Sequence, residues 1–292
     1  MGTIIDGLHV TRGNWRSRHS ALQLAVTAAK GCLADADTAP ADLDLLINAG
    51  IYRDRNLGEP ALAAIIQDDI GANPEDPHSD AHGTFSFDIT NGACGVLTAM
   101  QIADGFLRSR TISRALVVAS DADPGRGASE RFPFSPVGAA LLCTWSDQDD
   151  GLGPVHWSSD PDDGESCRAS IDFDMFRNVL RFRESAEMPG KLAAAGAKAA
   201  WRCLDDAALD VADVPVIIAA PPNHRYRAEL AARLGVSADR IAMASDEHMH
   251  TASLVAALKR ETGTLPAGSR VLLLAAGAGI VAGAALYRMP AR

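Results

Sequence analysis

The chain has 292 residues, of which 47% are hydrophobic and 22% charged, as is typical of a globular protein with a sizeable core. Its formal net charge is −10 and it has no basic run, so a nucleic-acid or anionic-membrane surface is not expected. No apolar run reaches the ~18 residues of a membrane span. The five cysteines are scattered without a CxxC pair, which argues against a disulfide framework or a zinc site. We therefore expect a cytoplasmic protein.

Helices and strands are predicted to alternate from the first residues onward. Residues 1–6 alternate weakly and predict an edge strand, residues 21–33 have helical spacing of apolar residues, and residues 43–49 form a short buried strand. Glu59 and Pro60 are expected to open a helix over residues 61–70. Proline suits a first helical turn, and a carboxylate there faces the positive end of the helix dipole.

Residues 84–123 are the centre of the pattern. Residues 85–89 alternate with the period of a strand, and residues 95–107 form a helix that is apolar nearly all round, which indicates burial. Residues 114–120 are almost continuously apolar, as in a strand covered on both faces. Cys94 lies where the first strand passes into the helix. The unpaired N–H groups of a helix N-terminus would stabilise a thiolate or an oxyanion there.

The second half of the chain has the same coarse order of elements. Asp and Gly clusters over residues 147–163 mark the best boundary between two halves, 1–150 and 151–292. The predicted elements around and after it are a strand (137–145), helices (173–187, 191–208, 228–234 and 251–261), a buried strand (214–220) and a closing hairpin (271–274 with 280–288). Strands that alternate with helices in both halves predict an α/β layered protein.

Four segments, at residues 50–61, 87–95, 223–225 and 272–289, together resemble the thiolase-fold condensing enzymes. More narrowly, they resemble the ketoacyl synthase III group and its branch that joins two fatty acyl thioesters head to head in olefin and β-lactone biosynthesis. The resemblance implies an α/β fold of five layers, α/β/α/β/α, built from two similar halves. The N-terminal half would carry Cys94, and the C-terminal half would carry the His and Asn loops.

The resemblance also implies a chemistry and partners. In the family a cysteine takes the acyl group, a histidine and an asparagine activate the second thioester, and backbone N–H groups hold the oxyanion. The substrates would be acyl-CoA or acyl carrier protein thioesters, without a tightly bound cofactor. The chain would form a homodimer, or a heterodimer with a ketosynthase homologue, through the sheet edge carrying residues 111–121.

The register around Cys94 leaves the nucleophile open. The family places one residue between its cysteine and the helix-opening glycine, whereas here Cys94 directly precedes Gly95. Either Ala93 occupies the nucleophile position and Cys94 packs as a small apolar residue, or a local rearrangement at Gly92 restores Cys94. If Cys94 is the nucleophile, it should be alkylated faster than the other four cysteines.

The Asn-x-Arg element is matched by Asn223 and Arg225, but the family histidine three positions before it corresponds to Ala220. His224, between the two matching residues, is either a catalytic partner of Asn223 or an exposed loop histidine.

His250 lies near the family's asparagine position, and His248 stands two residues earlier. We favour His250 as a residue that lines the site; the alternative is a pair of solvated loop histidines. His78 and His82 suggest a metal by their spacing, but no further ligand stands nearby, so a solvated loop is expected.

Glu59 lies in a segment that matches the head-to-head branch in register. The equivalent glutamate there reaches into the partner's active site as a proposed base, whereas the alternative role is a helix cap. Arg53 or Arg55 could hold Glu59 in place. Gly277 and Gly279 are expected to support an oxyanion pocket, since no helix follows them and they are not a dinucleotide fingerprint.

Two functions therefore remain open. The first is an active acyltransferase or condensing enzyme with an acyl-Cys94 intermediate; acyl transfer to an alcohol or amine is an intermediate case. The second is a catalytically degenerate subunit that pairs with an active homologue and supplies Glu59 in trans.

Overall fold

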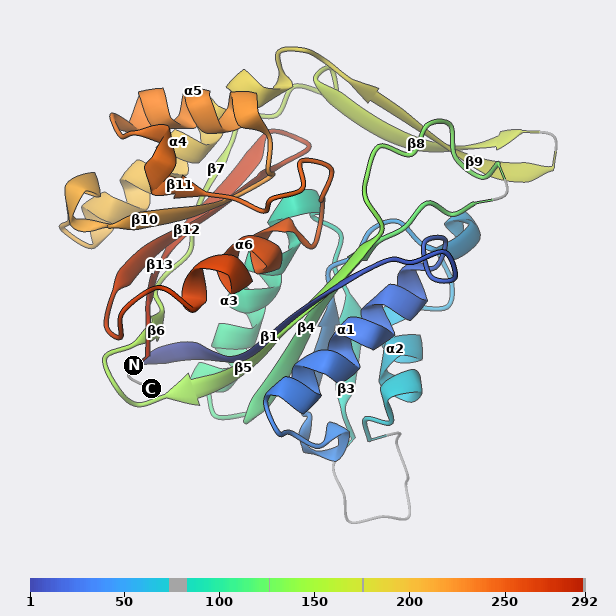
Figure 1. Cartoon of the computed structure of the whole chain (residues 1–292), viewed down its shortest axis with the longest axis horizontal. Helices are drawn as coiled ribbons and strands as arrows, with labels where there is room; N and C mark the ends of the chain where they lie inside the picture. The colour runs from blue at the N-terminus through green and yellow to red at the C-terminus, as the bar shows by residue number, and fades with distance from the viewer. Residues whose placement is uncertain (74–82, 126, 175, 291–292) are drawn as a thin grey trace.

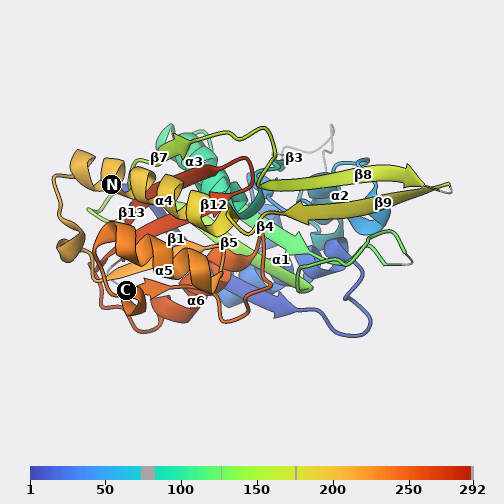
Figure 2. The same ribbon diagram turned by 90° about the horizontal axis from the view of Figure 1, so that it is seen from above.

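Two β-sheets alternate with three helical layers in the structure, a computed structural model that describes residues 1–73, 83–125, 127–174 and 176–290 (Figures 1 and 2). Helices α1 and α2 cover one outer face, α4 and α5 cover the other, and α3 and α6 lie between the sheets. Separate apolar clusters fill the spaces between successive layers. The predicted α/β fold with five layers is confirmed.

The N-terminal sheet has the strand order β1-β5-β4-β2-β3. Its strands are β1 (Gly2–Arg12), β2 (Leu45–Asn48), β3 (Phe85–Asp88), β4 (Arg114–Asp121) and β5 (Val137–Ser146). Strand β4 runs antiparallel to β5 and parallel to β2, and β2 runs parallel to β3. The helices of this half are α1 (Ala21–Asp35), α2 (Leu62–Ile70) and α3 (Gly95–Arg108).

The C-terminal sheet repeats this arrangement in the order β7-β13-β12-β10-β11. Its strands are β7 (His156–Ser159), β10 (Val216–Ala220), β11 (Ile241–Ala242), β12 (Arg270–Gly277) and β13 (Val281–Arg288), with α4 (Met188–Asp206), α5 (His224–Leu234) and α6 (Ser253–Thr262). The strand directions match those of the first sheet position by position. Strand β6 (Gly151–Leu152) pairs with β13 and β1 and joins the two sheets. The two halves are thus similar, and α3 and α6 hold equivalent places after β3 and β11.

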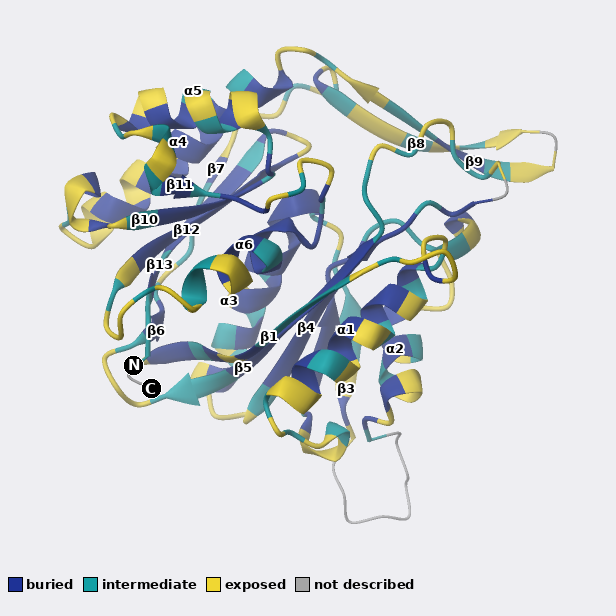
Figure 3. Ribbon diagram, in the orientation of Figure 1, coloured by how far each residue is buried: buried dark blue, intermediate teal, exposed yellow. Residues whose placement is uncertain are grey.

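Helix α3 lies at the centre, as its apolar sequence predicted. Val96, Met100, Ala103 and Leu107 are fully buried and belong to the cluster between the two sheets. Figure 3 shows much of α3 in the colour of buried residues. In the described part of the chain, no helix is long and apolar enough to cross a membrane.

A projecting antiparallel hairpin, β8 (Cys167–Asp174) with β9 (Arg177–Glu184), stands where a helix was predicted over residues 173–187 (Figure 1). Its strands pair along their full length, and Arg181 on β9 binds Asp172 on β8 at 2.5 Å. The helix prediction was wrong because the strand partner, rather than the local spacing, satisfies the backbone of this segment.

Two predicted sheet edges are also wrong. Strand β1 is longer than expected and lies between β5 and β6 inside the sheet path, and β4 is flanked by β2 and β5. Among the described residues, the path ends at β3 and β11. Phe85 on β3 is 60% exposed, so β3, rather than residues 111–121, is the open edge of the N-terminal sheet.

Candidate active site

Cys94 ends the short 3-10 turn Gly92–Cys94 and is the N-cap residue of α3. The thiol is fully buried, and its Sγ lies 3.5 Å from the carbonyl oxygen of Val281. Burial raises the pKa of Cys94 to about 12. The expected stabilisation of a thiolate by the helix N-terminus is therefore outweighed by desolvation, and in this conformation the thiol is protonated.

Gly277, at the end of β12, packs against the same turn. A Cβ built on Gly277 would lie 3.5 Å from the sulfur of Cys94 and 3.6 Å from the backbone nitrogen of Ala93. Gly279 follows in the hairpin turn with a φ of +80°, a conformation that favours glycine. The Cys94 side chain thus faces the turn of the closing hairpin, between Gly277 and Val281.

His250 approaches the turn from another side. A Cβ built on Gly92 would lie 3.6 Å from the Nε2 atom of His250. The imidazole ring stacks on Phe134, with centroids 4.2 Å apart, and contacts the ring of Tyr52 at 5.5 Å. Its side chain is 15% exposed, so it is held firmly while it stays within reach of a substrate.

Asp121, the last residue of β4, fixes the other side of the imidazole. The carboxylate is fully buried; its Oδ1 lies 3.2 Å from Nδ1 of His250. Its Oδ2 accepts hydrogen bonds from the backbone N–H and the hydroxyl of Thr251, at 2.7 and 2.8 Å. Because a carboxylate only accepts, the tautomer of the neutral imidazole that fits this contact has its proton on Nδ1 and its lone pair on Nε2.

Sequence reasoning missed Asp121 as a site residue. The available signal was an aspartate directly after a buried apolar strand, but its partner lies 129 positions away along the chain.

Asn223 and His224 serve local structure. The Asn223 side chain caps α5 by accepting a hydrogen bond from the backbone N–H of Tyr226 at 2.9 Å. The His224 side chain is 74% exposed, and its Nε2 lies 2.6 Å from a carboxylate oxygen of Glu247. Their contacts are with α5 and Glu247, and no hydrogen bond in the described chain joins either to the turn at Cys94.

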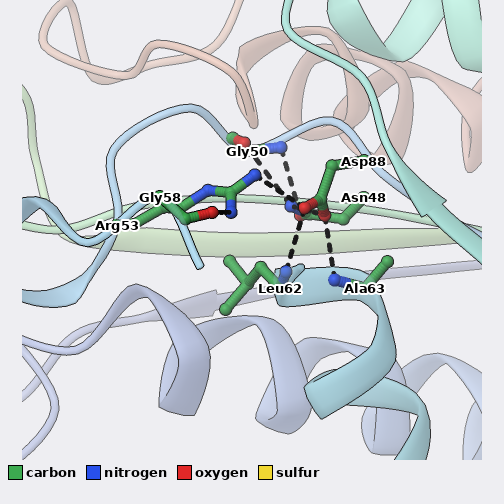
Figure 4. A network of polar contacts seen from close by, with 7 residues as sticks. All are labelled: Asn48, Gly50, Arg53, Gly58, Leu62, Ala63 and Asp88. Atoms are coloured by element: carbon green, nitrogen blue, oxygen red, sulfur yellow. Dashed lines mark hydrogen bonds and ion pairs between the residues drawn. The ribbon is translucent and has the colours of Figure 1, made fainter. Parts of the chain in front are cut away.

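Asp88, the last residue of β3, anchors the start of α2 (Figure 4). Its carboxylate accepts from the backbone N–H groups of Leu62 and Ala63 at 2.9 and 2.8 Å, and from the Asn48 amide at 3.0 Å. The helix begins at Leu62, so its dipole is met by Asp88 rather than by Glu59. Glu59 therefore does not act as the cap of this helix.

Arg53 connects the same carboxylate to the Glu59 segment. Its guanidinium donates to Asp88 and to the carbonyl oxygen of Gly58, both at 2.6 Å (Figure 4). Glu59 follows directly, is exposed, and joins Pro60 through a cis peptide bond. The arginine therefore holds the backbone beside Glu59, which leaves the carboxylate directed to the surface.

An apolar cavity of about 330 Å³ lies between residues 51–58 and the β8–β9 hairpin. Its apolar lining residues are Ile51, Tyr52, Leu57, Ala169, Ile171 and Leu180. Tyr52 lines this cavity and also contacts the His250 ring, so its side chain connects the two. The described residues contain no group of three or more His, Cys, Asp or Glu that could hold a metal; His78 and His82 lie outside them.

The sequence matches known condensing enzymes over most of its length. The family profile "3-Oxoacyl-[acyl-carrier-protein (ACP)] synthase III C terminal" matches residues 204–289. The beta-ketoacyl-[acyl-carrier-protein] synthase III of Anaplasma marginale is 26% identical, over 91% of this chain and 83% of that protein. The enzyme of the same name from Mycobacteroides abscessus is 27% identical, over 96% of this chain and 84% of that protein.

Solved structures agree on the fold. The 3-oxoacyl-(acyl carrier protein) synthase III of Pseudomonas aeruginosa PAO1 superposes with a TM-score of 0.81, at 19% identity, over 100% of this chain and 99% of that one. The chain is thus similar in sequence to the ketoacyl synthase III proteins and has the thiolase fold of these structures. A variant of OleA from Xanthomonas campestris superposes with a TM-score of 0.78, at 18% identity, over 98% of both chains. Where the ketoacyl synthase III pattern has its histidine this chain has Ala220, and His250 lies near the position of the asparagine in that pattern.

Proposed function

We propose that the chain is an acyltransferase or condensing protein of the ketoacyl synthase III type, acting on acyl-CoA or acyl carrier protein thioesters. The observation that carries the proposal is the placement of His250. Held by Asp121, it faces the turn that ends in Cys94 at the start of the central helix. The names of the sequence relatives support the same substrate class.

In the proposed reaction the Cys94 sulfur attacks the thioester carbonyl, and the thiol of CoA or of the carrier protein leaves with the proton that Cys94 gives up. Because the pKa of Cys94 is about 12 in the buried position, the thiol must first leave the Val281 carbonyl and pass its proton to a base. His250 Nε2, facing the same turn, is that base.

The apolar cavity beside Tyr52 would hold the acyl chain, and no tightly bound cofactor is needed. The exposed edge of β3, with Phe85, would pair with a second copy or with a ketosynthase homologue. Light scattering at micromolar concentration tests this association, and a monomer that binds no homologue would refute it. We also propose the cytoplasm as the location.

A second candidate is the catalytically degenerate subunit. The complete burial of Cys94, the raised pKa of its thiol and the alanine at position 220 favour this role. Glu59, exposed on a segment that Arg53 holds in place, would then be supplied to the partner's site.

Intact-mass analysis after incubation with a long-chain acyl-CoA decides between the two. An acyl adduct that forms on the wild-type chain and on Cys167→Ala, but not on Cys94→Ala, is expected for the first candidate. If only an added ketosynthase homologue becomes acylated, the first candidate is wrong and the degenerate subunit remains.

A further inference from the structure

We propose that His250 and Asp121 form a general-base pair for an oxygen or nitrogen nucleophile. The acyl acceptor would then be an alcohol, an amine or water rather than the carbon of a second acyl thioester. This inference rests on the proposed use of acyl thioesters, but it concerns the acceptor and not the acylation of Cys94.

The carboxylate is built to orient one ring nitrogen. Both hydrogen bonds from Thr251 fall on Oδ2 of Asp121, at 2.7 and 2.8 Å, which leaves Oδ1 to the Nδ1 atom of His250. Asp121 and Thr251 are fully buried, so water does not compete for these bonds. The pair therefore sets the tautomer of the imidazole as well as its position.

The ring plane is fixed as firmly as the tautomer. Phe134 stacks on His250 with an angle of 16° between the rings, and Tyr52 contacts it at 36°. The lone pair of Nε2 is consequently aimed at the Gly92 side of the turn, where the thioester carbonyl must lie if Cys94 is its neighbour. An aligned base of this kind is what general-base catalysis requires.

The His250–Asp121 pair is poorly suited to forming the enolate of a second acyl thioester. Stabilising an enolate oxygen takes hydrogen-bond donors, which the family pattern supplies through a histidine and an asparagine. Here Ala220 offers no side-chain donor, and Nε2 of His250 presents a lone pair rather than an N–H group. A lone pair backed by a carboxylate accepts a proton from an O–H or N–H group, so the geometry favours a heteroatom nucleophile.

The step balances without a further reactant. The acceptor oxygen or nitrogen attacks the thioester carbon while its proton passes to Nε2. The tetrahedral intermediate then expels the sulfur, the carbon–sulfur bond breaks, and Nε2 returns the proton to the leaving thiolate. The products are an ester, amide or acid and one free thiol.

The test follows free thiol release from octanoyl-CoA, with water alone and with added 1-butanol or butylamine, and identifies the acyl product by mass spectrometry. In Asp121→Asn the amide oxygen can keep both Thr251 bonds, which turns the amide nitrogen toward Nδ1. Nδ1 must then accept, so the proton moves to Nε2 and the base is lost. We expect kcat to fall by ~10²–10⁴-fold with KM little changed.

His250→Ala should show the same loss and recover part of its rate with added imidazole, which a purely structural histidine would not do. The matched controls are His9→Gln and Asp35→Asn, because His9 and Asp35 form a similar pair at 2.9 Å near the surface. Both controls should keep the wild-type rate.

The outcomes separate this inference from the proposed function. If Cys94 is acylated but Asp121→Asn and His250→Ala leave thiol release unchanged, or only a carbon–carbon product forms, the general-base pair is wrong. If no acyl-CoA is consumed and no adduct forms, the proposed function fails and the inference fails with it. Ester, amide or acid formation that both variants lose, and that imidazole partly restores in His250→Ala, supports the inference.

Discussion

Two contacts join the similar halves at the centre of the molecule. In each, the end of a strand in one half meets the residues before a central helix of the other half, but the residue at the strand end differs. The end of β4 in the first half meets the loop before α6, through Asp121 and His250. The end of β12 in the second half meets the residue before α3, through Gly277 and Cys94. The topology is the same, but one strand ends in a carboxylate and the other in a glycine.

The surroundings of the two side chains, His250 and Cys94, differ accordingly. The imidazole receives a charged partner and stays 15% exposed, whereas the thiol finds a backbone carbonyl and complete burial. The two similar halves therefore supply two equivalent helix starts, one facing a carboxylate and the other facing a glycine. In this conformation the imidazole of His250 is oriented to accept a proton, whereas the thiol of Cys94 is protonated and buried.

The largest effect is expected for Glu59, a residue outside both contacts, and it tests whether a catalytic group also lies there. Glu59→Gln should leave folding and association intact, because the amide conserves shape and the Arg53 bonds reach Gly58 and Asp88 instead. In a complex with a condensing homologue, turnover should nevertheless fall by ~10²–10⁴-fold, as expected for a missing acid–base group, while acylation of the cysteine survives.

The control for Glu59 is Asp69→Asn, an exposed carboxylate on the neighbouring helix α2. Full turnover of Glu59→Gln in the complex would show that its carboxylate has no catalytic part, and would confine the chemistry to the two contacts between the halves.

The second prediction concerns the thiol side of the comparison. Burial raises the pKa of Cys94 from 9.0 to about 12, so its thiolate fraction near pH 8 falls by roughly 10³. Iodoacetamide should therefore modify Cys94 ~10³-fold more slowly than a cysteine of ordinary pKa, with a rate that rises tenfold per pH unit. Half-buried Cys167 should react first. A Cys94 that acts as the nucleophile without leaving this position would instead react faster than the other four cysteines.

The same shift has a consequence for stability. The pKa of Cys94 is higher in the folded protein than in the unfolded chain. The buried thiol therefore contributes fully to the free energy of unfolding below about pH 9, and this contribution is lost as the pH rises toward 12. Peptide mapping across this range measures the alkylation. Modification of Cys94 as fast as Cys167 near neutral pH would show that the thiol readily reaches an active position, and the contrast between the two contacts would disappear.

The sequence predicted those parts of the fold that depend on local periodicity. The apolar helix α3, the strand over residues 137–145 and the closing hairpin follow from spacing alone. It failed where partners are remote: the β8–β9 hairpin is decided by strand pairing, and the interior position of β1 by its pairing with β5. In the site, Cys94 and His250 could be selected, but the Asp121 contact and the burial of the thiol required the packed structure.

A third prediction compares two strand-end carboxylates, the partly buried Asp88 and the buried Asp121. Asp88 accepts four hydrogen bonds, one from the Arg53 guanidinium, so an amide would leave donors unpaired and remove the counter-charge. Asp88→Asn should lower the free energy of unfolding by about 1–3 kcal/mol. Asp121→Asn should cost less, since it can keep both Thr251 bonds. Denaturant titration measures both, and the reverse ranking would mean that Asp121 is chiefly structural.

The smallest effect tests whether the cavity beside Tyr52 serves the histidine contact. Ala169 lines that cavity from β8 and is exposed, so a larger side chain there should fill the cavity without disturbing the core. Excluding about two methylene groups of an acyl chain costs ~1.6 kcal/mol, which raises KM about 15-fold. We expect this increase in Ala169→Trp for a long-chain acyl-CoA and no change for acetyl-CoA.

Arg168→Trp is the matched control, because successive residues of a strand point to opposite faces and Arg168 is also exposed. An equal rise of KM in both variants would indicate a general disturbance of the hairpin. An unchanged KM for long chains in Ala169→Trp would place the acyl chain elsewhere, and His250 would then act on a carbonyl delivered along a different path. A rise in KM for long-chain acyl-CoA in Ala169→Trp alone would show that the acyl chain occupies the cavity. Tyr52, which lines the cavity and contacts the His250 ring, would then connect the acyl chain with the histidine.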